Sequence, residues 1–245
     1  MSTFIRPDHI HQIEDTIHQL IDFSWRKGFG LKLRMISDEA MILCAQRDFI
    51  FTPDENNFDY IYNIKKFLAC EGKRYSTLRN QINRFKKKYP NVCTEIFTSF
   101  SFIKEKIVGL QERWNFNKNR QKNLLVGEDP ESAALQRIFD LEQDNFIIVC
   151  IFFKNVMIGF CISELLPSSV YALSHFAKAD VSFSGVYSYM LYETCAVLFN
   201  AGKYYLNYQQ DLGLIELRHF KKSFHPVCFL KKYSVYKKEN NFLLV

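Results

Sequence analysis

A carboxylate and two cations lie close together near the C-terminal end of the sequence. Asp211 follows residues 204–208, a short segment predicted as a strand, and precedes residues 212–223, which are predicted as a helix. Arg218 and Lys221 share one face of that helix at a spacing of three, so both side chains can reach one anionic group. Asp211 could orient a substrate amine or accept its proton, or it could equally be the N-cap of the helix. For the two cations, a solvated helix face is the plain alternative.

A second group of candidates lies around the end of another predicted strand, residues 170–177. His175 lies within this strand, where a satisfied core or rim histidine is the default interpretation and a general base is the alternative. Lys178 follows at the end of the strand, where clefts open, and is the better functional candidate. The next helix is predicted to begin at Gly185, and its free N–H groups and positive dipole end could bind a phosphate. Ser184 and Gly185 could equally be only a helix cap and a turn.

Basic residues gather on a predicted helix that spans residues 73–89 and stops at Pro90. Arg79, Asn83 and Lys86 fall on one flank of its apolar stripe, where an ordinary solvated surface is the alternative to a functional role. The lysine run at residues 86–88 more often serves solubility than nucleic-acid binding. It nevertheless provides phosphate contacts that a tRNA acceptor arm could use.

Other signatures of chemistry are missing from the sequence. There is no G-x-S-x-G elbow, no P-loop and no H-E-x-x-H motif. His9, His11 and His18 lie on an acidic-to-neutral predicted helix without cysteine partners, so no metal site is predicted. The seven cysteines are scattered singly, as expected of buried thiols in a reducing cytosol. No permanently bound cofactor is expected.

The composition predicts a folded, soluble and cytoplasmic protein. The 245 residues are 48% hydrophobic, which is enough to bury a core. The longest apolar runs, such as residues 146–153, stop far short of the roughly 20 residues that cross a bilayer, and no secretory signal is visible at the start. A net charge of +6 indicates an anionic partner such as a cofactor phosphate, a nucleic acid or a lipid surface.

The hydrophobic pattern predicts the elements that must position these groups. In the first part we expect a helix at 7–26, a two-strand meander at 31–35 and 40–45, a third strand at 58–62 and a short helix at 65–70. After Pro90 we expect a strand at 92–97, a helix at 99–116, a polar linker at 117–127, and a helix with Asp129 as N-cap and Pro130 in its first turn. An antiparallel meander at 147–153, 156–165 and 170–177 follows, then a helix at 185–200, a strand at 204–208, a helix at 212–223, a strand at 227–236 and a possible edge strand at 241–245. From residue 92 onward, this order is similar to that of the GNAT acetyltransferase fold.

Several motifs carry a more specific resemblance. Residues 59–62 read D-Y-I-Y, residues 72–85 fit G-K-x-Y-x-x-x-R-N-x-x-N-x-F, residues 207–213 fit N-x-x-Q-D-L-G, and residues 217–226 fit L-R-x-x-K-x-S-x-x-P. His175 to Asp180 and Ser184 to Tyr187 continue the match. Together they resemble the C-terminal domain family of bacterial phosphatidylglycerol lysyltransferases, a family with a GNAT-like or Fem-like aminoacyltransferase fold. The chain is similar to a stand-alone soluble member, and the resemblance covers nearly its whole length.

The resemblance implies an α+β (α/β) chain of two tandem GNAT-like halves, with two mixed sheets flanked by helices. An abbreviated half would span residues 1–90 and a complete half residues 91–245. It implies catalytic roles for Asp211, Lys178, His175 and Asn207, substrate binding by Arg218, Lys221, Ser223, Arg79, Asn83 and Tyr75, and donor-phosphate binding by Ser184, Gly185 and Tyr187.

The implied activity is acyl transfer to an amine or hydroxyl of a small molecule or lipid headgroup. Aminoacyl-tRNA is favoured over acyl-coenzyme A (acyl-CoA) as donor, because no Gly-rich loop precedes residue 185. Two departures from the family pattern, Phe176-Ala177 before Lys178 and Asn207-Tyr208-Gln209 before the Q-D pair, remove a carboxylate and a guanidinium. They motivate the alternative of a catalytically inactive protein that binds RNA, a protein or a small molecule. A third possibility is weak binding to an anionic surface through the lysine pairs at residues 231–232 and 237–238.

Overall fold

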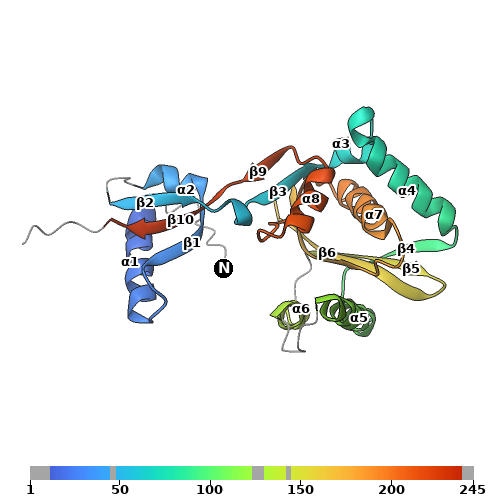
Figure 1. The fold of residues 1–245 in the computed structure, drawn as a ribbon, viewed down its shortest axis with the longest axis horizontal. Helices are drawn as coiled ribbons and strands as arrows, with labels where there is room; N and C mark the ends of the chain where they lie inside the picture. The colour runs from blue at the N-terminus through green and yellow to red at the C-terminus, as the bar shows by residue number, and fades with distance from the viewer. Residues whose placement is uncertain (1–11, 45–47, 123–129, 142–144, 239–245) are drawn as a thin grey trace, which may run out of the picture. The chain divides into compact units, whose positions relative to one another are not determined.

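The computed structural model describes residues 12–44, 48–122, 130–141 and 145–238 as a mixed α+β chain with sheets of three and seven strands (Figure 1). The described residues form two compact units. The first unit comprises Met1–Tyr60, Gln209–Lys222 and Cys228–Val245, and the second comprises Ile61–Tyr208 and Ser223–Val227. This grouping joins C-terminal segments to N-terminal ones. The predicted boundary at residue 90 concerns two acyltransferase-like halves and stays a prediction.

An antiparallel sheet in the order β1-β10-β2 forms the centre of the first unit. The elements of this unit are α1 (Ile13–Arg26), β1 (Lys32–Ser37), α2 (Asp38–Leu43), β2 (Phe49–Pro53), the 3₁₀ turn η2 (Glu55–Asn57), β9 (Cys228–Leu230), β10 (Lys232–Lys237) and α8 (Ile215–Ser223) up to Lys222. Ile13, Ile17 and Ile21 recur every four residues on α1, so they lie on one face and are buried. That face packs with Phe49 and Val235 into the core of the unit.

The structure corrects the predicted meander of the first unit. Residues 40–45 were expected to form a strand, but the helix α2 ends there at Leu43. Ser37 caps this helix, because its side chain accepts a hydrogen bond from the Ala40 backbone N–H at 3.2 Å. The place beside β10 is taken by β2, which the sequence pattern did not reveal. The predicted strand at 227–236 is also divided, since β9 and β10 belong to different sheets.

The second unit is built on the larger sheet, whose strand order is β4-β5-β6-β7-β8-β3-β9. Its other strands are β3 (Asp59–Asn63), β4 (Val92–Phe97), β5 (Phe146–Phe153), β6 (Val156–Leu165), β7 (Tyr171–Ala179) and β8 (Tyr205–Asn207). Asp59 and Tyr60 of β3, and the strand β9 described above, are part of this sheet but are grouped with the first unit. Its helices are α3 (Ile64–Ala69), η3 (Lys73–Tyr75), α4 (Ser76–Lys88), α5 (Lys104–Lys122), α6 (Pro130–Phe139) and α7 (Val186–Asn200). Neighbours from β4 to β7 are antiparallel, whereas β7 and β8 are parallel.

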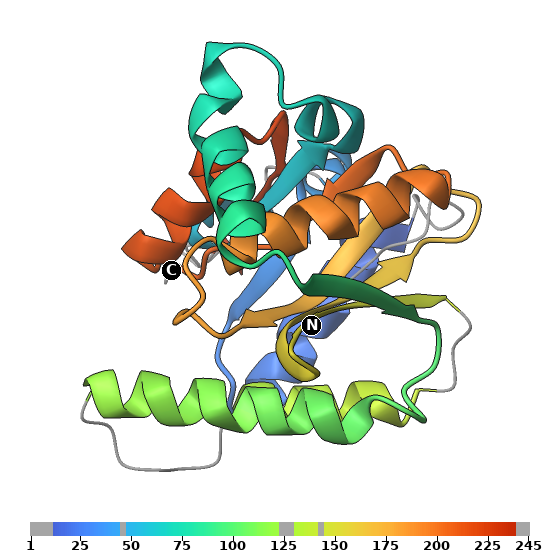
Figure 2. The ribbon, with the colours of Figure 1, turned by 90° about the vertical axis from the view of Figure 1, so that its right-hand side faces the viewer.

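Helices cover both faces of this sheet (Figure 2). Helices α5 and α6 pack on one face through Ile107, Leu110 and Leu135, in a cluster that includes Ile148 and Phe160. Helix α7 lies on the other face with α3 and α4 beside it (Figure 1). Strand β5 is therefore buried along almost its whole length, which explains its unbroken apolar run.

The predicted meander at 147–177 is confirmed, as are the helices near 185–200 and 212–223. The predicted linker at 117–127 is partly wrong, since α5 continues to Lys122. Residues 123–127, the Asp129 cap and the possible edge strand at 241–245 lie outside the described residues. No helix in the described part of the chain is both long and apolar enough to cross a membrane.

Candidate functional site

The Asp211 carboxylate, only 2% exposed, is the centre of a hydrogen-bonded group in the first unit. The Tyr60 hydroxyl donates to Asp211 Oδ2 at 2.6 Å. Arg218 donates through Nε to Oδ2 at 2.8 Å and through Nη2 to Oδ1 at 3.0 Å. The Nη2 group of Arg218 also donates to Asn56 Oδ1 at 2.7 Å. We call Asn56, Tyr60, Asp211 and Arg218 the Asp211 centre.

Local backbone geometry explains part of the Q-D-L-G motif. The Gly213 backbone N–H donates to Asp211 Oδ1 at 2.8 Å, which closes a tight turn after the carboxylate. Gly213 has a φ of +76°, and a Cβ there would come within 2.9 Å of the Asn56 side chain. Since α8 begins only at Ile215, Asp211 lies too far ahead of the helix to be its N-cap.

The pKa values of Asp211 and Tyr60 in the Asp211 centre are far apart. Burial by itself raises the pKa of Asp211, but the hydrogen bonds from Arg218, Tyr60 and the Gly213 backbone outweigh it and lower the pKa to about 2. Burial and the bond to Asp211 raise the pKa of Tyr60 to about 12. At neutral pH the carboxylate is therefore ionised and the phenol protonated. A carboxylate of such low basicity is better suited to orienting neighbouring groups than to accepting a proton.

Lys221 reaches the same segment from α8. Its ammonium donates to the backbone carbonyl oxygens of Gln209 at 3.2 Å and Gln210 at 2.8 Å, and it lies 5.7 Å from the centroid of the Tyr60 ring. Burial lowers its pKa to about 8, although Asp59 and Asp211 raise it. The spacing of Arg218 and Lys221 therefore does bring both cations to one place. They bind the protein's own segment around Asp211, Arg218 through the Asp211 carboxylate and Lys221 through the preceding carbonyls.

A polar hollow of about 530 Å³ lies in the first unit and shares Asn56 with the Asp211 centre. Lys32 and Arg34 of β1, Tyr236 of β10 and the turn residues Asp54 and Asn57 are among its lining residues. The two cations suit an anionic ligand. Sequence reasoning did not find this hollow, because its walls come from segments about 200 residues apart.

Lys178 lies at a different place, in the second unit. Its ammonium is 2.7 Å from Glu131 Oε1 and 3.5 Å from the centroid of the Trp114 ring. Glu131 thus supplies a carboxylate to Lys178 from α6, although Phe176-Ala177 offers none beside it. Tyr187 belongs to the same surroundings, where burial raises its pKa and Trp114 and the Ala179 backbone hydrogen-bond to it. A pocket of about 180 Å³ shares Trp114 with this group.

The other predicted residues of the second unit do not join Lys178. His175 Nε2 lies 2.7 Å from Glu164 Oε2, and its ring contacts Phe146. Arg79 donates to the backbone oxygen of Cys70, the residue that ends α3. The Tyr75 ring contacts His225 at 5.1 Å. Asn207 is buried on β8, whereas Asn83, Ser184 and Ser223 are exposed.

Gly185 has a packing reason to be glycine. Its φ is +91°, and a Cβ there would lie 3.3 Å from the Gln81 backbone oxygen and 3.4 Å from Phe85 Cβ. The Ser188 hydroxyl, in the first turn of α7, donates to Gln81 Oε1 at 2.7 Å. The start of α7 therefore packs closely against α4.

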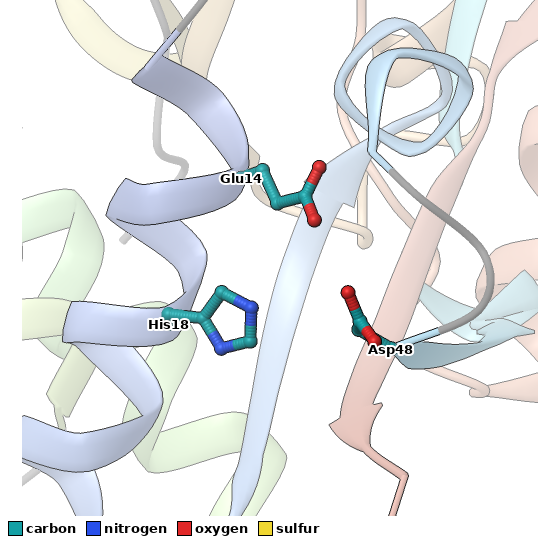
Figure 3. Close-up of side chains that lie close together, drawn as sticks. All are labelled: Glu14, His18 and Asp48. Carbon is teal, nitrogen blue, oxygen red and sulfur yellow. The ribbon is translucent and has the colours of Figure 1, made fainter.

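Glu14, His18 and Asp48 lie close together in the first unit (Figure 3). Their ligating atoms are all within 4.8 Å of one another, and side chains of these types bind divalent cations. The sequence analysis missed this group, because Asp48 is thirty positions from His18. Glu14 and Asp48 each have a further interaction in the structure, so the group alone does not assign a metal site.

Comparison with known proteins gives one curated relative and several solved structures. An uncharacterized protein of Mycoplasmoides gallisepticum, MYCGA3080, is 24% identical over 192 residues, which are 74% of this chain and 56% of the relative. The chain thus spans little more than half the length of that relative.

Two solved structures share the fold. A conserved protein of unknown function from Bacteroides thetaiotaomicron has a TM-score of 0.76 at 24% identity, over 92% of this chain and 75% of the other. L-PGS from Bacillus licheniformis has a TM-score of 0.66 at 14% identity, over 96% and 75%. The model of the family "Phosphatidylglycerol lysyltransferase, C-terminal" matches residues 5–236, nearly the whole chain, and the protein therefore belongs to that family.

Proposed function

We propose that this protein transfers an aminoacyl group from aminoacyl-tRNA, or an acyl group from acyl-CoA, to an amine or hydroxyl acceptor. Family membership and the GNAT-like fold support this class of reaction. The observation that carries it furthest is the Asp211 centre, where residues of three family motifs meet beside a hollow large enough for part of a substrate. In this proposal the chain consists of two GNAT-like halves, residues 1–90 and 91–245.

The geometry suggests distinct roles for the residues of the first unit. Asp211 fixes the side chains of Tyr60 and Arg218, and the N–H groups of the Arg218 guanidinium that do not bind Asp211 are donors for a developing oxyanion. Lys32 and Arg34 in the hollow would hold a phosphate of the donor. Lys221, whose pKa burial lowers to about 8, keeps the segment before Asp211 in place.

Aminoacyl-tRNA is the favoured donor. Binding a coenzyme A pyrophosphate at the start of α7 needs free backbone N–H groups and room for the phosphates. Here the close packing of Gly185 against α4 restricts that room, and no Gly-rich loop precedes the helix. A phosphate role for Ser184, Gly185 and Tyr187 is accordingly the weaker part of the proposal.

The second unit offers further candidates. Lys178, with Glu131 and Trp114, lies beside the smaller pocket and would bind part of the acceptor or donor. The exposed side chains of Asn83 and Ser223 remain candidates for substrate binding. The contact of Arg79 with Cys70 gives it a structural role that is sufficient to explain its presence in the motif.

A non-catalytic binding function is the second candidate. Its support is that both Asp211 oxygens accept hydrogen bonds from the protein and that the Lys221 ammonium donates to two backbone carbonyls. A binding protein descended from the same family would keep such a centre for its structure alone.

Binding and transfer can be separated by experiment. We expect charged tRNA to raise the thermal stability of the protein more than uncharged tRNA or acetyl-CoA does, because the donor should bind most tightly. A ligand at 100 times its Kd adds about 2.7 kcal/mol to the free energy of unfolding. Arg34→Glu in the hollow should remove this shift, whereas Lys65→Glu, on an exposed part of α3, should not. A rise in thermal stability with acyl-CoA alone would make acyl-CoA the donor in place of aminoacyl-tRNA. Binding of charged tRNA without release or transfer of its aminoacyl group would favour the non-catalytic function.

A further inference from the structure

The last turn of α1 and the turn from it to β1 expose several large apolar side chains. Phe23 is 49% exposed, Trp25 63%, Phe29 78% and Leu31 42%. They lie within nine consecutive residues at one end of the first unit (Figure 1). We call Phe23, Trp25, Phe29 and Leu31 the aromatic tip.

The aromatic tip continues a pattern that elsewhere forms the core. Ile13, Ile17 and Ile21 lie along α1 at steps of four and are buried, and Trp25 is the next member of this series. The core of the unit ends before this position, so the apolar stripe of the helix runs on into solvent. An apolar stripe that extends past the core indicates a surface that binds another protein or a membrane.

The turn that carries the aromatic tip is closed by its own hydrogen bonds. The backbone N–H of Gly28 donates to Trp25 O at 2.9 Å, and that of Phe29 donates to Ser24 O at 2.9 Å. Gly28 and Gly30 have φ values of +75° and +88°, which allow the chain to reverse over so few residues. Phe29 is thus presented outward by a defined backbone.

Cations accompany the aromatic tip. Arg26, in the last turn of α1, and Lys27, which follows the helix, are exposed, and the Lys27 ammonium lies 5.8 Å from the centroid of the Phe23 ring. Lys32 follows at the start of β1, and Asp22 is the only acidic residue between positions 22 and 34. Aromatic side chains favour the headgroup level of a bilayer, and nearby lysine and arginine side chains are attracted to anionic lipids.

We propose that the aromatic tip inserts into the surface of a bilayer that contains anionic lipid, with Trp25 and Phe29 at the headgroup level and Arg26 and Lys27 on lipid phosphates. The charge of the turn complements such a surface, and a short turn with its apolar side chains directed outward suits a deformable lipid layer. The proposal does not rest on acyl transfer. It also differs from binding through the lysine pairs near the C-terminus, because Lys232 is buried and paired with Asp59.

Fluorescence of Trp25 tests the insertion directly. The chain has two tryptophans, so the Trp114→Phe variant of the full chain reports on Trp25 alone. We expect its emission to shift to shorter wavelength with vesicles of phosphatidylcholine and phosphatidylglycerol at a ratio of about seven to three, and the shift to weaken with salt. Vesicles of phosphatidylcholine alone should produce a smaller shift. No shift with either vesicle would overturn the proposal.

Co-sedimentation of the chain with both native tryptophans gives an independent measurement. Phe29→Glu should lower the vesicle-bound fraction at least about tenfold, because a carboxylate is costly to insert at the bilayer surface and is repelled by anionic headgroups. The control Phe102→Glu changes a phenylalanine that is 86% exposed on the second unit and should bind as the unmodified chain does. Equal binding of the two variants would contradict the proposal. So would a blue shift of Trp25 that depends on protein concentration in the absence of vesicles, since it would make the aromatic tip an interface between copies.

Discussion

At the scale of single residues, two ionisable groups, Asp211 and Lys221, hold the segment around Asp211 in place. Asp211 binds Tyr60, Arg218 and the Gly213 N–H, and Lys221 binds two carbonyl oxygens of the preceding segment. Gln209 and Leu212 have φ values of +55° and +56°, a conformation that side chains other than glycine seldom adopt. The hydrogen bonds to this segment offset the strain of those conformations. A defined backbone at a motif of polar residues is what a preorganised site requires.

Asp211→Asn should lower the free energy of unfolding at pH 7 by about 2 kcal/mol, because hydrogen bonds to a charged acceptor are replaced by weaker ones. The pKa of Asp211 in the fold is about 2, below its ordinary value of 3.8. Its contribution is therefore complete above pH 4 and is lost as the pH falls through 2. Urea unfolding of the two proteins from pH 7 to pH 2 should show their difference shrinking only below pH 4. Asp22→Asn, at an exposed position, serves as the control and should change little; a constant difference between the unsubstituted protein and Asp211→Asn at all pH values would show that charge is not the cause.

At the scale of elements, the start of α7 shows how a helix can have the sequence of a phosphate-binding turn and a different role in packing. Ser184-Gly185 precedes the helix as a donor-binding turn would, yet Gly185 approaches the Gln81 backbone, and Ser188 binds the Gln81 side chain. The contact between α4 and α7 explains why a small residue with positive φ is needed at this point.

Gly185→Ala should destabilise the protein more than Gly202→Ala. Both glycines have positive φ, +91° and +76°, so each alanine pays about 1 kcal/mol for the left-handed conformation. At Gly185 the new Cβ also crowds neighbouring atoms, whereas at Gly202 it would meet no atom of the described residues within 4 Å. Chemical denaturation of the two variants measures this difference. Equal destabilisation would mean that α4 moves away from α7 without cost.

At the scale of the whole molecule, the N-terminal residues depend on the C-terminal end of the chain. Strand β10 lies between β1 and β2, and its Val235 is fully buried among residues of α1 and β2. The sheet of the first unit thus lacks its central strand until the last tenth of the chain is present. By contrast, the strands from β4 to β7 in the second unit are consecutive in the sequence.

A chain that ends at residue 227 should keep the second unit folded and lose the first. Without β10, strands β1 and β2 have no common partner and Val235 is missing from the core, so residues 12–60 become accessible to protease. Limited proteolysis followed by mass spectrometry would locate the cuts. A chain that ends at Lys238 keeps every described element and should resist as the full chain does. Protection of residues 12–60 in the shorter chain would contradict this dependence.

Local patterns in the sequence determine much of the second unit and part of the site. The meander at 147–177 and the helix at 185–200 follow from apolar periodicity and turn residues, which depend only on neighbours along the chain. The spacing of Arg218 and Lys221 likewise determines that both reach one place, and the motif residues identify the family. Where a local signal competes with another, as at residues 40–45, the Ser37 cap decides for a helix against the apolar run.

Only the tertiary structure decides which distant segments meet. Tyr60 and Asn56 join Asp211 and Arg218 across about 150 residues, and Asp48 comes to Glu14 and His18 from the far side of α2. It also decides that Lys221 of α8 binds the backbone of the segment before Asp211. The tertiary structure likewise decides that Trp25, in the apolar stripe of α1, lies beyond the core and is exposed. The physical reason is that periodicity records which face of an element is apolar, whereas the partner of a buried polar group depends on how sheets and helices pack. That packing is a property of the whole chain.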